Sequence, residues 1–179
     1  MHKLSDTYAT YCQRTSTLAR SLILTRLDYW NSLLHGSHAS SIQTLKRVQN
    51  NAARILLQAP RRCRANPLLR QLHWLPVRHR IKYELAVMTY KIHSTGLPAY
   101  LSNHINPRES TRKLRSSDTL LLTVPFTRTE LAKRAFRCSS PSVWNSLPSF
   151  ITNSGSLATF RYGLKTYFFR LSFDYSIHV

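Results

Sequence analysis

Basic side chains are the residues of this sequence whose number and spacing point most directly to a chemistry. Residues 29–83, a stretch of 55, include ten Lys or Arg and no Asp or Glu. A solvated helix surface normally mixes the two signs, because opposite charges four residues apart support a helix. The accumulation of one sign therefore favours a surface that contacts the phosphates of RNA or DNA. For the basic and amide side chains between Gln43 and Arg54, a helix face that is simply exposed to solvent is about as good an explanation as phosphate contact.

Phosphate contacts are predicted for nine residues of this stretch and for three residues of a Ser-, Arg- and Lys-rich connector, residues 107–118. The composition of the connector is slightly more typical of a linker than of a second phosphate-contacting loop. The predicted contact set is Lys46, Arg47, Arg54, Arg61, Arg62, Arg64, Arg78, Arg80, Lys82, Arg112, Lys113 and Arg115. Nothing in this pattern distinguishes RNA from DNA.

The charge of the whole chain agrees with a polyanionic partner. The formal net charge is +19, from 26 Lys and Arg against 7 Asp and Glu. Such an excess repels itself in a compact state and favours nucleic acid first and an anionic membrane surface second. A truncated piece whose acidic partner domain is missing would have the same composition. No apolar run is long enough to span a bilayer. With nucleic acid as the leading candidate, we expect no membrane among the partners.

Cysteine usage and the N-terminal residues bear on the compartment. The three cysteines are widely spaced and form no CxxC pair, which favours a reducing interior. The first residues include no apolar signal region. We therefore expect an intracellular protein of the nucleus or cytoplasm that is not secreted.

Residues for catalysis or metal binding do not assemble in the sequence. A two-metal polymerase needs carboxylates held a few ångströms apart, and the seven here are scattered with no two adjacent. His35 and His38 are three residues apart, but no cysteine pair stands at zinc-finger spacing. No nucleophile–base spacing and no glycine-rich phosphate loop occur. We expect no enzyme activity, no metal and no cofactor.

The clearest predicted element is a helix that begins at Pro76 and ends before Gly96. Proline suits the first helical position, and glycine suits the left-handed residue after a helix. The apolar stripe recurs at i, i+4, i+7 and i+11, as one face of a helix requires. Its members are Ile81, Leu85, Met88 and Ile92.

Further helices are predicted around this one. A first helix covers 17–34 and stops at Gly36; a second starts with a capping box of Ser40 and Gln43 and closes at Pro60. Its predicted core face is Ile42, Leu45, Val48, Ala52 and Ile55. Short helices are predicted for 66–72, with Asn66 as the cap, and for 98–105.

The C-terminal half is predicted to contain a small β element. Residues 120–125 form a short apolar run that ends in proline, and residues 133–139 are a weaker strand candidate that would return beside it. Trp144 is predicted to anchor a core within short turns. Ser156 is predicted to cap a last helix, whose buried stripe is Leu157, Phe160, Leu164 and Tyr167 or Phe168.

The predicted fold is mainly α, a bundle of about four to six helices with a small β-hairpin-like element in the C-terminal half. The predicted organisation is a frayed N-terminus (1–16), a basic helical region (17–106), a basic connector (107–118), a small α+β element (119–171) and a tail (172–179). One domain, or one domain with a small appendage, fits the length of 179 residues.

Ordered motifs from residue 22 to residue 170 also resemble one family. They are TRLDYWNSLL (25–34), LKRVQNNAARILL (45–57), HWLPVRHRI (73–81), LRSSD (114–118) and VWNSLP (143–148). Together they resemble the region after the polymerase in LINE (non-LTR) retrotransposon polyproteins of the jockey and chicken-repeat type. Two details depart from the family: Trp30 stands where a cysteine is common, and TELAKRAFRCS lacks a Tyr-Gly pair.

The resemblance implies polymerase ancestry without polymerase activity. The aromatic-x-Asp-Asp motif of reverse transcriptases is absent here, and in the family it lies upstream of this region. The parent region, thumb-like in its position, sits beside the polymerase and helps hold template or target nucleic acid. We therefore expect a reverse transcriptase fragment that binds nucleic acid without sequence preference. The alternatives are a module that docks on the missing polymerase domain, or an inert translated remnant of the transposon.

Overall fold

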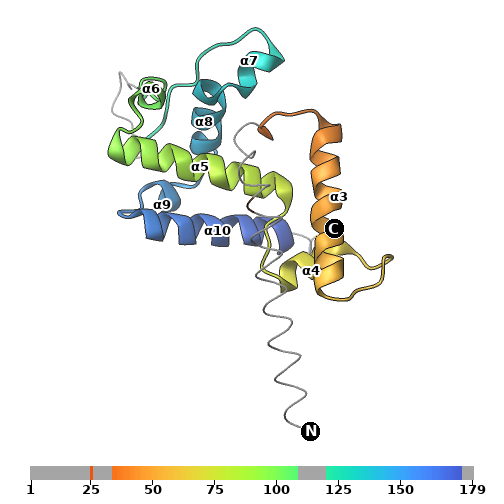
Figure 1. The fold of residues 1–179 in the computed structure, drawn as a ribbon. Coiled ribbons are helices and arrows are strands. Elements are labelled where there is room, and N and C mark those ends of the chain that lie inside the picture. Colours follow the sequence, from red (N-terminus) through yellow and green to blue (C-terminus); the bar gives the residue numbers. More distant parts are fainter. Residues whose placement is uncertain (1–24, 26–33, 109–119, 175–179) are drawn as a thin grey trace.

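Three long helices form the frame of the structure, a computed structural model that describes Thr25 and residues 34–108 and 120–174 (Figure 1). The described residues contain eight named helices and no named strand. The helices are α3 (Ala39–Leu56), α4 (Ala65–Gln71), α5 (Val77–Thr95), α6 (Ala99–Ser102), α7 (Glu130–Arg134), α8 (Phe136–Asn145), α9 (Ser149–Thr152) and α10 (Leu157–Phe173). The prediction of a mainly helical fold is confirmed.

Helix α5 lies at the centre of this arrangement. It runs antiparallel to α10 along one side and packs against α8 on another, while α3 stands across one end of the pair (Figure 1). The main core joins Leu85 and Ile92 of α5 to Trp144 of α8 and to Phe160 and Leu164 of α10. Helices from both sides of the predicted connector therefore share one core.

The predicted boundaries of α5 are confirmed to within one residue. Pro76 is the N-cap, and Gly96 takes the left-handed conformation with φ +67° and donates its N–H to Ile92 O. No neighbouring atom crowds Gly96, so the positive φ alone favours glycine there. Ile81, Leu85 and Ile92 are buried and Met88 is half-buried, as the stripe predicted.

Two further core predictions are confirmed. Trp144 is buried, and its indole N–H donates to Leu120 O at 2.9 Å. Ser156 caps α10 by accepting the N–H of Thr159 at 3.2 Å, and Phe160, Leu164 and Phe168 are buried behind it. An apolar stripe preceded by a serine cap is therefore sufficient to place this last helix.

The predicted β-hairpin is wrong for the described residues. Leu122 makes one isolated bridge with Pro107, and the side-chain amide of Asn145 takes both the N–H and the C=O of Leu122 at 2.9 and 2.8 Å. A side chain thus occupies the hydrogen-bonding groups that a partner strand would need. Residues 133–134 instead end α7, which Thr129 caps, and residues 136–139 begin α8, with Ala135 between the two helices.

The predicted start of α3 is also wrong. The helix begins at Ala39 after the N-cap His38, whose ring accepts the N–H of Ser40 at 3.4 Å, so Ser40 and Gln43 form no capping box. The predicted core face is half right, since Ala52 is buried while Val48 and Ile55 are 45% and 77% exposed.

Two other predictions differ or lie outside the described residues. Helix α4 begins at Ala65 with Arg64 as its N-cap, and Asn66 is not the cap. The predicted helix over 17–34 lies outside the described residues apart from Thr25 and Leu34. Gly36 follows with φ +69°, as a stop residue requires.

Gln49 is buried on the inner face of α3, where the sequence predicts the apolar Val48 and Ile55 to lie. Its Nε2 donates to Leu75 O at 2.8 Å, and its Oε1 accepts the N–H of Val77 at 3.2 Å. Val77 is the first residue of α5, where backbone N–H groups have no partner within the helix. The fully buried amide therefore joins α3 to the start of the central helix.

We expect Gln49→Leu to lower the free energy of unfolding by about 2–4 kcal/mol, because it leaves a buried carbonyl and a buried N–H without partners. Urea denaturation followed by circular dichroism measures this change. The matched control is Ile55→Ser on the exposed side of the same helix, which should stay within about 0.5 kcal/mol of the parent. Equal effects of the two substitutions would contradict the role of Gln49.

His79 joins α5 to the C-terminal part of α10. Its Nδ1 lies 2.5 Å from Ser172 Oγ, and its ring stacks on Phe168 with a centroid distance of 5.5 Å. Burial, and secondarily the positive charge of Lys82, hold the pKa of His79 below its ordinary value. The native state therefore keeps His79 neutral at pH values where the unfolded chain binds a proton.

This difference predicts a loss of stability in mild acid. As the pH falls below the ordinary histidine value of 6.5, the unfolded state gains protons first, and the free energy of unfolding decreases. The pH dependence should be shallower in His79→Gln than in the parent chain. Urea midpoints between pH 7.5 and 5 measure it, with the exposed His104 replaced by Gln as the control. Superimposable curves for parent and His79→Gln would contradict the assignment.

Candidate nucleic-acid interface

Four cationic side chains line one cavity between α3, α4 and the C-terminal end of α10. The cavity has a volume of about 530 Å³. Its cations are Lys46 and Arg54 of α3, Arg64 before α4, and Arg70 of α4. We call this site the basic cavity.

A second hydrophobic cluster builds the basic cavity. Ala52 and Ala53 of α3 pack with Leu68 and Leu69 of α4 and with Phe173 of α10. Lys46, Asn50 and Arg54 follow one another at intervals of four residues, so they lie along one side of α3. The packing of the small alanine face turns that side toward α4 and the end of α10, and all three residues line the cavity.

Arg54 holds the basic loop (residues 60–64) against α3. Its Nε and Nη2 donate to Cys63 O at 3.3 and 3.2 Å, and its Nη1 donates to Asn51 Oδ1 at 3.1 Å. A planar guanidinium makes such a fork in a way that a lysine does not. Arg54 therefore positions the loop and contributes its charge to the cavity from a fixed place.

Arg70 is paired with the carboxylate of Asp174 at the end of α10. The Nη2–Oδ1 distance is 3.5 Å, and both side chains are exposed. An exposed pair of this kind contributes about 0–1 kcal/mol. A phosphate can therefore compete with Asp174 for the guanidinium of Arg70.

The structure brings part of the predicted contact set together. Lys46, Arg54 and Arg64 line the basic cavity, and the exposed Arg61 and Arg62 belong to the same loop as Arg64. Arg70 is not among the predicted contacts, although it lies in the same acid-free stretch. The signal that would have included it is the turn of helix directly after the basic loop.

The remaining predicted residues do not line the basic cavity. Arg47 is exposed on α3, and Arg78, Arg80 and Lys82 belong to the first turns of α5. Lys82 lies near His35 and His79, since its charge contributes to lowering the pKa of both. Arg112, Lys113 and Arg115 lie outside the described residues.

Metal ligands and membrane-spanning segments are the two other features that bear on function in this part of the chain. Within residues 34–108 and 120–174, no group of three His, Cys, Asp or Glu is placed to hold a metal ion. None of the helices described there is both long and apolar enough to cross a bilayer.

Comparisons with models of protein families, with curated proteins and with solved structures find no match to this chain.

The role of Arg54 predicts a change in proteolysis. Arg54→Lys keeps the charge but removes the fork that binds the Cys63 carbonyl, so trypsin should cleave after Arg61, Arg62 or Arg64 several-fold faster. Mass spectrometry of a short digestion series measures the rates at these bonds. Arg47→Lys on the exposed side of α3 is the control and should cleave at the parent rate. If Arg54→Lys is cleaved no faster than the parent chain, the positioning role of Arg54 is contradicted.

Proposed function

We propose that this chain is a piece of a LINE-type reverse transcriptase polyprotein, from the region after the polymerase, that binds nucleic acid without sequence preference. The observation that carries the proposal is the convergence of four cations from two helices and a loop on the basic cavity. A charge-bearing loop held by a fixed arginine fork presents donors to phosphate oxygens at a low ordering cost.

The expected contacts are to the phosphate backbone. Arg64 and Arg70 offer forked donors, and Lys46 offers a compact charge. Contacts of this kind position a strand but carry no sequence information. The chain is proposed to hold template or target nucleic acid beside the polymerase of the parent polyprotein, and to have no polymerase activity itself.

The residues behind the family resemblance are mostly structural in this chain. Trp74, Leu75 and Val77 of the HWLPVRHRI motif are buried, as are Trp144 and Leu147 of VWNSLP. These motifs therefore specify a corner before α5 and the end of α8. Buried motif residues support the proposal that the resemblance reflects a shared fold. The residues that bind nucleic acid would then lie on the basic surface of that fold.

A salt series tests the proposal. Phosphate neutralisation makes log K fall linearly with log salt, with a slope of about −0.9 per phosphate on duplex DNA. Neutralising the loop with Arg61→Gln, Arg62→Gln and Arg64→Gln should weaken binding and make the slope shallower by about 0.9 for each lost contact. Fluorescence anisotropy with a labelled RNA and a matched DNA duplex measures both quantities.

The matched control removes the same charge elsewhere. Lys91, Arg128 and Arg137 are exposed and do not line the basic cavity, so replacing all three with Gln should preserve most of the slope. If the two triple variants lose affinity equally, the net charge of the chain and not the basic loop is responsible. That result would refute the proposed site.

Docking on the polymerase domain of the parent polyprotein is the second candidate function. Val48 and Ile55 are seven residues apart on α3 and are both exposed, which places two large apolar side chains on one side of the helix. Such a surface favours a protein partner. Self-association that persists at high salt and disappears in Val48→Ser with Ile55→Ser would favour this function over nucleic-acid binding.

A further inference from the structure

A second cavity lies away from the basic cavity and has a different chemistry. Its volume is about 610 Å³, and its walls come from His35 and Gly36, from residues 124–127, and from α7 and α8. No residue lines both cavities. We call it the α7–α8 cavity.

Two polar groups of the α7–α8 cavity have no hydrogen-bond partner. Ser139 of α8 is 1% exposed, and its Oγ is buried without a partner. His35 Nδ1 is likewise buried without a partner, and both residues line the cavity. Buried polar groups are almost always hydrogen-bonded in folded proteins. Two exceptions at one cavity therefore point to a ligand with hydrogen-bonding groups of its own.

The ring of His35 offers a neutral group to such a ligand. Burial, and secondarily the charge of Lys82, hold its pKa below the ordinary value. A neutral imidazole Nδ1 either donates or accepts, according to its tautomer, and a serine hydroxyl does both. The inner groups therefore suit a ligand whose edge carries both donors and acceptors.

The wall that carries His35 is fixed by a close approach. A Cβ built at Gly36 would lie 3.0 Å from Arg134 Cγ, and Gly36 also has φ +69°. Only glycine fits this turn without strain or displacement of Arg134. The turn therefore seats His35 next to α7.

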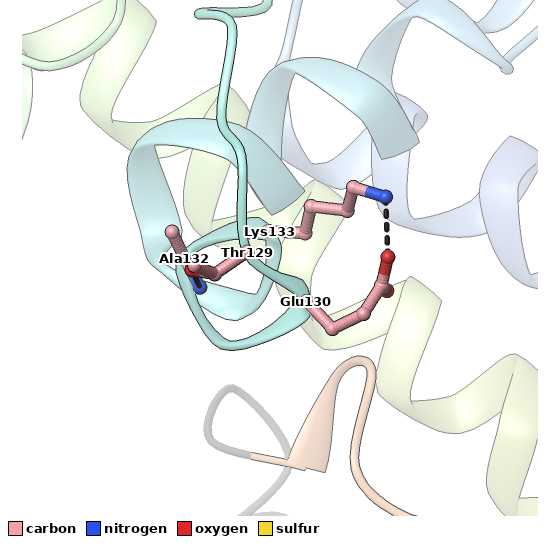
Figure 2. Close-up of polar contacts among 4 residues, drawn as sticks. All are labelled: Thr129, Glu130, Ala132 and Lys133. Carbon is pink, nitrogen blue, oxygen red and sulfur yellow. Dashed lines mark hydrogen bonds and ion pairs between the residues drawn. The ribbon is translucent and has the colours of Figure 1, made fainter.

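Helix α7 places one acidic and one basic side chain at the α7–α8 cavity, and these two charges neutralise each other. Thr129 accepts the N–H of Ala132, and Lys133 pairs with Glu130 on the same short helix (Figure 2). Arg134, which also lines the cavity, adds a positive charge beyond this pair. The cavity thus combines neutral hydrogen-bonding groups with one further cation.

Phe126 supplies an aromatic surface at the same cavity. It lines the cavity and is 87% exposed, so its ring is accessible to a ligand. Exposed aromatic rings beside basic residues are the platforms on which unpaired bases stack in single-strand-binding proteins. The edge of a nucleobase also has the mixed donors and acceptors that Ser139 and His35 require.

We propose that the α7–α8 cavity binds one unpaired nucleobase, stacked on Phe126 and hydrogen-bonded to Ser139 and His35, with its phosphate near Arg134. The inference rests on the proposed function in one respect, namely that the nucleobase belongs to a nucleic-acid strand bound by this chain. It adds a preference for single-stranded over duplex nucleic acid, which the basic cavity alone does not supply.

The test uses the full chain and two probes, free AMP and a short single strand with 2-aminopurine at its centre. Phe126→Ala should lower affinity for both probes about tenfold, as loss of a stacking contact does, and leave duplex binding unchanged. Phe150→Ala removes another exposed phenylalanine, outside this cavity, and should change neither. The 2-aminopurine fluorescence should report stacking in the parent and lose that signal in Phe126→Ala.

Ser139→Ala separates a ligand site from a structural role. Removing a buried hydroxyl without a partner should keep or raise the melting temperature while weakening AMP binding. A lower melting temperature with unchanged AMP affinity would overturn the inference.

The two proposals fail in different ways. If Phe126→Ala binds AMP and the single strand like the parent, while neutralising the basic loop weakens strand binding, the nucleobase site is wrong and the phosphate surface stands. If AMP binds in a Phe126-dependent way but no strand binds in a salt-dependent way, the nucleobase site stands and the proposed function is wrong.

Discussion

The burial of α5 on more than one side is the constraint on which the rest of the described structure depends. Its buried residues include Ala86, Val87 and Thr89 in addition to the predicted stripe, because α8 covers a second side of the helix. Thr89 Oγ1 lies 2.7 Å from Ser140 Oγ within this contact. A buried polar pair has few equivalent positions along an apolar surface, so it fixes how α8 sits along α5.

The basic cavity follows from the same central helix. Gln49 ties α3 to the start of α5, and the C-terminal end of α10, which packs along α5, closes the second hydrophobic cluster with α3 and α4. The cations of the basic cavity therefore lie on or next to α3 and α4, whose positions are fixed by packing against the core. Repulsion among like charges is offset by packing and by the arginine fork on the basic loop.

The sequence predicted the elements whose signals are local. A proline before an apolar stripe and a glycine after it placed α5, and Ser156 placed α10, because caps and helical periodicity act over a few residues. The β-hairpin was wrong because the amide of Asn145, 23 positions away in the chain, takes the backbone groups of Leu122. The burial of Gln49 was missed for the same kind of reason, since its partners Leu75 and Val77 are 26 and 28 residues distant. For the site, the sequence indicated the basic stretch but not which cations converge, because convergence depends on tertiary packing.

Chemical-shift mapping by NMR tests the central claim most directly. A short RNA or DNA titrated into the ¹⁵N-labelled chain should shift the amides of residues 61–66 and of the Lys46–Asn50–Arg54 side of α3, and added salt should reverse the shifts. Saturable shifts confined to these residues would place the polyanion at the basic cavity. Shifts spread over the exposed surface, or centred on Val48 and Ile55, would contradict the account.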